Sequence, residues 1–285
     1  MSASPDDDRS TRKAVILAAG AGSRMRRGSP DVLDKDNRGA IRDGLKGMIR
    51  FHNRPFLDYA LQLLVDAGLD DLCLVVSGQR SMLNEYYETM AGAMTGSRLS
   101  FAVQHEPLGT AHALLAAEEF TGGDPFLVVN CDNLYPVETI TALKGMPAPA
   151  LTLFDREGLL RGNIPADRIA DMSLVETDDR GCMTRIIEKP GTEESATFDW
   201  DAPISMNSWH FGPEIFDACR AIPPHPARNE FEIPSAALHL VTRKGLCLMT
   251  TRFSLPVYDL TSVRDIKPVE KVTGAMRITL PAVSP

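Results

Sequence analysis

A glycine-rich turn near the start of the chain has the composition of an anion-binding loop. The apolar run 14–17 leads directly into Ala-Ala-Gly-Ala-Gly-Ser-Arg-Met-Arg-Arg over residues 18–27. Small residues let backbone N–H groups approach an anion closely, and the nearby arginines add positive charge. We therefore expect a phosphate ligand; the alternative is a tight turn whose glycines serve packing alone. The turn matches neither a Walker A loop nor the dinucleotide fingerprint.

Two later segments place polar side chains just past apolar runs. Gln104 is followed five positions later by Gly109 and then by Thr110. A glutamine amide can pair with the edge of a pyrimidine, and a glycine lets the base lie against the backbone, so this segment predicts a nucleobase slot. The alternative is a strand end followed by a helix N-cap. Asp132 follows the apolar run 126–129, a position suited to holding a cation.

The composition limits the partners of the chain. Its 285 residues carry a formal net charge of −8, which argues against a nucleic acid or an anionic membrane as the main partner. We expect a cytoplasmic protein, because the sequence shows neither a transmembrane run nor a signal peptide. The five cysteines are odd in number and mostly lie in apolar runs, which predicts reduced thiols rather than a disulfide or zinc framework.

The elements that must position these side chains follow an alternating pattern. Apolar runs at 14–18, 72–76, 101–104, 126–129 and 150–154 predict strands, and helical periodicity at 55–67 and 110–120 lies between them. Strands that are apolar on both faces and alternate with helices predict a mostly parallel sheet covered on both sides. Further on, we expect strands at 183–188, 207–211 and 246–251 and helices at 213–221 and 232–243.

Motifs in a consistent order resemble the signatures of sugar-1-phosphate nucleotidyltransferases. They are Leu-Ala-Ala-Gly-Ala-Gly-Ser-Arg-Met at 17–25, Lys-Gly-Met-Ile from Lys46, the segment from Gln104 to Thr110, the strand end at Asp132, Glu-Lys-Pro at 188–190, and Tyr-Asp-Leu at 258–260. The resemblance extends over residues 13–265, which is most of the chain.

The resemblance implies a role for each motif residue. Arg24, Lys46 and Asp132 would be catalytic, and Asp132 with Asp259 would hold Mg²⁺, because one carboxylate rarely holds this ion firmly. The nucleotide would be bound by Leu17, Ala19, Gly20, Gly22, Ser23, Gln104, Gly109 and Thr110. The sugar phosphate would be bound by Ser173, Glu188, Lys189 and Asn207.

The fold that we expect is α/β: a Rossmann-like, mostly parallel sheet flanked by helices, with a mixed α+β acceptor-binding half. Residues 1–12 would be a disordered tail, and 13–285 a single domain made of a nucleotide-binding half (13–155) and a sugar-phosphate-binding half (156–285). An assembly of several copies of the chain is left open.

The activity implied is the joining of a nucleoside triphosphate, with UTP or dTTP favoured, to a sugar 1-phosphate, giving an NDP-sugar and pyrophosphate. One alternative is a cytidylyltransferase acting on a phosphorylated amino-alcohol or phosphonate, which would also use a segment like Lys-Gly-Met-Ile. The other is a non-catalytic, nucleotide-binding regulatory module. It draws support from Cys131 and Ser173, which stand where the family has glycine.

Residues 28–44 are an insertion relative to the family, between the glycine loop and Lys46. The segment is polar and has few large apolar residues, so we expect it to lack buried anchors and to be mobile when no substrate is bound. Closure over the triphosphate would make it an active-site lid. The alternative is a surface loop without a role in the chemistry.

Overall fold

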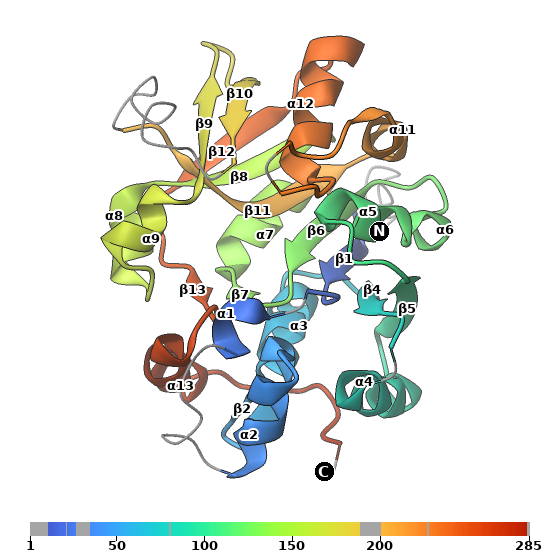
Figure 1. The fold of residues 1–285 in the computed structure, drawn as a ribbon, viewed down its shortest axis with the longest axis vertical. Coiled ribbons are helices and arrows are strands. Elements are labelled where there is room, and N and C mark those ends of the chain that lie inside the picture. The colour runs from blue at the N-terminus through green and yellow to red at the C-terminus, as the bar shows by residue number, and fades with distance from the viewer. Residues whose placement is uncertain are drawn as a thin grey trace, which may run out of the picture.

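A nine-stranded mixed sheet forms the centre of the protein (Figure 1). The computed structural model describes residues 11–20, 22–26, 35–79, 81–188, 201–226 and 228–283. Along the sheet, the strands run β10 (Met183–Ile187), β9 (Ser173–Thr177), β11 (Ile204–Phe211), β6 (Phe126–Asn130), β1 (Lys13–Leu17), β4 (Asp71–Ser77) and β5 (Arg98–Gln104), while β8 (Ala150–Phe154) pairs with β11 and β12 (Met249–Phe253).

The sheet is parallel in its first half and mixed in its second, as the sequence predicts. Strands β6, β1, β4 and β5 pair in parallel, whereas β11 pairs antiparallel with β6, β8 and β9. From β1 the chain moves outward to β4 and β5 and then returns to the other side of β1 as β6. This reversal is the switch point at which ligands bind in open α/β sheets, beyond the carboxyl ends of the strands.

Helices cover both faces of the sheet. Alternate residues of each strand point to opposite faces, and because central strands such as β1 and β6 are apolar on both sides, both faces carry apolar side chains that must be covered. Ala14, Ile16 and Leu127 belong to one core, and Val15 and Val128 belong to the other. The first face carries α2 (Lys35–Arg42), α3 (Phe56–Asp66), α4 (Met82–Ala93) and α7 (Val137–Lys144). The second carries α5 (Thr110–Leu115), α6 (Glu118–Thr121), α11 (Glu214–Ala221) and α12 (Ile233–Lys244).

Short elements connect this framework. They are α1 (Ser23–Arg26), η3 (Lys46–Met48), β2 (Arg50–Phe51), β3 (Arg54–Pro55), β7 (Asn133–Leu134), α8 (Arg156–Arg161), α9 (Ala166–Ala170), β13 (Tyr258–Asp259), η4 (Val263–Asp265) and α13 (Ile266–Thr273). Among the described residues, no helix has both the length and the apolar character needed to cross a bilayer.

Several predicted elements have different bounds, and β5 and β11 each begin three residues earlier than predicted. The helix predicted at 110–120 is wrong as one unit, because the chain leaves helical geometry at Ala117 and forms α5 and α6 separately. The strand predicted from residue 246 begins at Met249 instead, since the Leu246 N–H still bonds to the Leu240 carbonyl at the end of α12. By contrast, α3 ends at Asp66, close to the predicted end at 67, and Gly68 follows with a φ of +79° that suits a helix C-terminus.

The predicted insertion is partly helical. Residues 35–42 form α2, and Ala40 and Ile41 are buried in the first core. The Asn37 side chain also bonds both ways with the Arg50 backbone, at 2.6 and 3.1 Å. The prediction that this segment lacks buried anchors is therefore wrong for α2. Residues 28–34 lie outside the described residues, and the lid remains a prediction.

The cysteine prediction requires a correction as well. Cys182 and Cys247 form a disulfide, although 65 positions separate them in the sequence. The Met183 N–H bonds to the Leu248 carbonyl at 2.8 Å, so backbone pairing brings the two Cα atoms to 5.3 Å. Cys73, Cys131 and Cys219 are free thiols.

The start of the described chain is packed. Thr11 is buried, and its hydroxyl lies 2.9 Å from His210 Nε2, while Arg12 forms an ion pair with Asp70. Both residues fall inside the predicted tail of 1–12, whose first ten positions lie outside the described residues.

Candidate active site

Two adjoining cavities lie at the carboxyl ends of the parallel strands, beside the switch between β1 and β6. The first, of about 490 Å³, follows the glycine loop after β1 and reaches Gln104 at the end of β5. The second, of about 530 Å³, is lined from β9, β11 and β13. Lys46, Asn130 and Asp132 line both, so the two spaces meet at the end of β6.

The glycine loop lines the first cavity through Leu17, Ala19, Gly20 and Gly22, all predicted to contact nucleotide. A Cβ added to Gly20 would meet no atom within 4 Å, so the loop is open to a ligand there. Gly22 has a φ of +56°, and a Cβ on it would lie 2.1 Å from the Gly44 carbonyl oxygen. This close contact joins the loop to the segment that carries Lys46. Ser23, also predicted to bind nucleotide, is exposed and lines neither cavity.

Lys46 and Asp132 form an ion pair at the junction of the cavities, with Nζ 2.7 Å from Asp132 Oδ2. Burial alone would lower the pKa of Lys46, but the attraction and the hydrogen bond to the Asp132 carboxylate, together with attraction to Asp259, outweigh burial and raise the pKa above its usual value. The lysine is therefore a fixed cation. Arg24, the other predicted catalytic cation, extends from α1 and lines the second cavity.

Asp259 reaches the same place through a pair of short strands. β13 pairs antiparallel with β7, which sets Asp259 opposite Asn133, and the Leu260 N–H bonds to the Asp132 carbonyl at 2.8 Å. Burial, and then repulsion from Asp132, raise the pKa of Asp259 to about 6. Its Oδ1 is buried without a hydrogen-bond partner. The structure thus brings the two predicted metal carboxylates together.

The far end of the first cavity holds the predicted base-binding residues Gln104, Gly109 and Thr110. Gly109 has a φ of +112°, and a Cβ on it would lie 2.4 Å from the Phe231 carbonyl oxygen, so only glycine fits this turn. The Thr110 hydroxyl accepts the Ile233 N–H at 3.0 Å and secures the start of α12. The slot is therefore built between the β5–α5 turn and the segment before α12.

The second cavity holds Ser173, Glu188 and Asn207, three of the four predicted sugar-phosphate residues. The Ser173 hydroxyl donates to Glu188 Oε2, which fixes that carboxylate beside β9. Asn207 has a φ of +58° inside β11, where the register with β8 shifts, and its Oδ1 accepts from Trp209 Nε1 at 3.3 Å. Lys189 lies outside the described residues.

Several lining residues were not predicted. Asn130 is the last residue of β6, so the strand-end argument that selected Asp132 could have found it. Arg168 lines the second cavity, 3.7 Å from Asp259, and its guanidinium donates to both oxygens of Asp265 at 2.9 Å. No local signal marks Arg168, because its position depends on Asp265, 97 positions later. Glu230 lines the first cavity from the C-terminal half.

The surroundings of Cys131 disfavour a nucleophilic role for its thiol. Burial and the neighbouring Asp132 carboxylate raise the pKa of its thiol to about 12, so the reactive thiolate is scarce at neutral pH.

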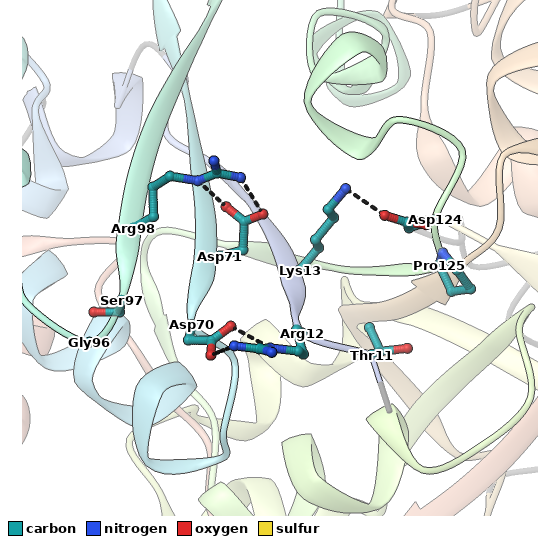
Figure 2. Close-up of a pocket in the computed structure, with 10 residues that line it drawn as sticks. All are labelled: Thr11, Arg12, Lys13, Asp70, Asp71, Gly96, Ser97, Arg98, Asp124 and Pro125. Atoms are coloured by element: carbon teal, nitrogen blue, oxygen red, sulfur yellow. Dashed lines mark hydrogen bonds and ion pairs between the residues drawn. The ribbon is translucent and has the colours of Figure 1, made fainter. Parts of the chain in front are cut away.

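A larger hollow, of about 770 Å³, lies at the opposite edge of the sheet, where β1, β4 and β5 begin (Figure 2). Figure 2 shows that three ion pairs cross it: Arg12–Asp70, Lys13–Asp124 and Arg98–Asp71. Each of these cations already faces a carboxylate, and the hollow is at the amino ends of the strands. We therefore take the two cavities on the carboxyl side as the candidate active site.

Known proteins resemble this chain over most of its length. Residues 13–247 match the model of a family described as nucleotidyl transferase. The chain is 29% identical over 233 residues to the UTP–glucose-1-phosphate uridylyltransferase AglF of Haloferax volcanii, covering 82% of this chain and 84% of the relative. It is also 29% identical over 237 residues to a glucose-1-phosphate thymidylyltransferase of Streptomyces antibioticus, covering 80% of this chain and 57% of that relative.

Solved structures share the fold. A crystal structure of UDP-glucose pyrophosphorylase complexed with UDP-glucose aligns with a TM-score of 0.71 and 18% identity, covering 93% of this chain and 100% of the other. A thymidylyltransferase structure from Bacillus anthracis, described as putative and in complex with sucrose, aligns with a TM-score of 0.68. At this level of identity the likeness concerns the fold, which is the predicted Rossmann-like α/β arrangement.

Proposed function

The chain belongs to the nucleotidyl transferase family, and on that premise we propose that it joins a nucleoside triphosphate, UTP or dTTP, to a sugar 1-phosphate, giving an NDP-sugar and pyrophosphate. The observation that carries the proposal is the meeting of two cavities at Lys46 and Asp132. A transfer between two substrates needs adjoining spaces that hold the reacting groups in contact. The relatives named for uridylyl and thymidylyl transfer favour UTP or dTTP.

In this proposal the triphosphate occupies the first cavity. The base enters the slot at Gln104 and Gly109, and the phosphates follow the glycine loop toward Lys46. The sugar 1-phosphate occupies the second cavity, with Glu188 and Asn207 at the sugar and Arg24 near its phosphate. Both substrates then present their reacting atoms at the shared wall.

The reaction is an in-line displacement at the α-phosphorus. An oxygen of the sugar phosphate forms a bond to this phosphorus, the bond to the bridging oxygen of the β-phosphate breaks, and pyrophosphate leaves with the electron pair. Negative charge accumulates on the non-bridging oxygens of the α-phosphate. Lys46, held as a cation by Asp132, and Arg24 would stabilise this charge. No covalent enzyme intermediate is required.

Asp132 and Asp259 fit a bound Mg²⁺. They are close enough for Asp132 to raise the pKa of Asp259, and Asp259 Oδ1 is buried without a hydrogen-bond partner. No group of three or more His, Cys, Asp or Glu suited to a metal occurs among the described residues. That agrees with Mg²⁺, which is usually held by one or two carboxylates together with substrate phosphates and water. When bound, it supplies positive charge to the reacting phosphate.

Pyrophosphate release tests the proposal. UTP, dTTP, CTP, GTP and ATP are each incubated with a hexose 1-phosphate or a phosphorylated amino-alcohol in the presence of Mg²⁺, and products are identified by mass. We expect release that needs both UTP or dTTP and a sugar 1-phosphate. Release with CTP and the amino-alcohol phosphate would support the cytidylyltransferase instead. The Asp132→Asn protein, purified in parallel, controls for contaminating enzymes.

A further inference from the structure

His112 lies in the first turn of α5, next to Gln104, the residue proposed to bind the base. The Gln104 amide nitrogen is 3.0 Å from the Gly109 carbonyl oxygen and 3.2 Å from His112 Nδ1. Gln104 is 6% exposed and lines the first cavity, so this amide is held at the cavity wall rather than in solvent.

These two contacts determine which way the amide faces. The group next to the Gly109 carbonyl must be the NH₂, because two carbonyl oxygens at that distance would repel each other. An amide nitrogen only donates, so His112 Nδ1 must accept, and the ring proton is on Nε2. Both N–H groups of Gln104 are therefore used inside the protein. The amide oxygen is the polar atom left for a ligand.

We propose that His112 is a positioning residue that makes the site select uracil or thymine over cytosine, an inference that rests on the proposed function. An amide oxygen accepts from the N3–H of uracil or thymine, whereas N3 of cytosine carries no hydrogen and would face a second acceptor. The triphosphate held along the glycine loop limits how far the base can shift to present another edge. Cytosine is rejected because its N3 and the Gln104 amide oxygen are both acceptors and would face each other without a hydrogen bond in a confined slot.

Two variants at position 112 distinguish a role of His112 in orienting the Gln104 amide from a role in packing alone. In His112→Asn, the side-chain oxygen stands at the position of Nδ1 and can accept from the same amide. In His112→Leu, the volume is largely kept but the acceptor is lost, so only the Gly109 carbonyl still holds the amide, and the amide can turn an N–H toward cytosine N3. Selectivity for UTP over CTP should then depend on the acceptor and not on the volume.

The experiment is binding calorimetry of UTP, dTTP and CTP to the full chain with Mg²⁺ and without acceptor. We expect wild type and His112→Asn to favour UTP and dTTP, and His112→Leu to lose about tenfold or more of that preference. Melting temperatures confirm that each variant is folded.

A wild-type preference for CTP, an unchanged preference in His112→Leu, or an equal loss in both variants would overturn the role of His112. If no triphosphate binds the wild type, the proposed function itself fails, and this inference fails with it. Binding without acceptor keeps that failure distinct from an error in the acceptor alone.

Discussion

Lys46 and Asp132 carry opposite charges 2.7 Å apart where the two cavities meet. The pairing keeps the lysine protonated and the carboxylate oriented, so neither group has to reorganise when charge develops on the α-phosphate. The free energy needed to orient these two groups is therefore supplied when η3 and β6 fold, and not during the reaction.

The Asp132→Asn substitution tests this arrangement. It removes one negative charge without changing the volume, so the fold should persist while turnover falls by about 100-fold or more. The measurement is kcat from pyrophosphate release, with the melting temperature recorded alongside. Asp124→Asn is the matched control, because it removes a surface partner of Lys13 at the opposite edge of the sheet. Turnover in Asp132→Asn within about tenfold of wild type would contradict the assignment.

The raised pKa of Asp259 predicts that the stability of the metal-free protein depends on pH. Burial and Asp132 raise its pKa to about 6 in the folded state, above the value of about 3.9 in an unfolded chain. Its contribution to stability is therefore fully present below pH 4 and is lost as the pH rises through about 6. The Asp259→Asn side chain does not ionise and escapes this loss.

We therefore expect the melting temperature of Asp259→Asn, relative to wild type, to increase between pH 5 and pH 7 in the presence of EDTA. Thermal unfolding monitored by circular dichroism measures this difference. Adding Mg²⁺ should stabilise wild type more at pH 7 than at pH 5, because the ion needs the deprotonated carboxylate. A difference that stays constant across this range would show that Asp259 does not titrate there.

At the scale of elements, apolar strands were predictable and distant contacts were not. β6 is apolar on both faces, and its carboxyl end leads to Asp132, so local sequence was sufficient for both. The helix α4 was not predicted, although its buried Leu83, Tyr86, Tyr87 and Met90 follow helical spacing. Polar residues between these positions obscure the apolar spacing, so an interpretation based on composition does not detect the helix.

Contacts between distant segments explain the remaining differences. α2 is secured by burial of Ile41 and by the pairing of Asn37 with Arg50, neither of which a local pattern reveals. Asn207 was selected by resemblance, but its left-handed conformation arises from the irregular pairing of β11 with β8. The disulfide is of the same kind, because it depends on the pairing of residues around Cys182 and Met249.

The disulfide between the start of β10 and the segment before β12 should stabilise the acceptor half. It closes a loop across 65 positions. In the chain-entropy description this lowers the entropy of the unfolded chain and adds about 4 kcal/mol to the free energy of unfolding. Reduction by dithiothreitol should lower the melting temperature of wild type by several degrees. The double variant Cys182→Ser, Cys247→Ser should start from the lower value and should not respond to the reductant. Equal melting temperatures for oxidised and reduced wild type would show that the bond adds no stability.

At the scale of the whole molecule, the two predicted halves share one sheet. β11 pairs with β6 of the nucleotide half through Trp209 and Val128, and with β8 through Trp209 and Leu151. The base slot also depends on the C-terminal half, since Phe231 closes over Gly109 and Glu230 lines the cavity. Neither half would keep its site if the other unfolded.

This continuity predicts that the chain unfolds in one cooperative transition. Trp209 is fully buried in β11 at the seam between the halves, and Trp200→Phe leaves it as the sole tryptophan of the two in the sequence. Its fluorescence should change at the same urea concentration as far-UV circular dichroism, and UTP with Mg²⁺ should shift both curves together. Two separated transitions, or a shift by UTP of one signal alone, would mean that the halves fold as independent domains. In that case the second cavity, which is lined from both halves, would be an interface between domains rather than a preformed site.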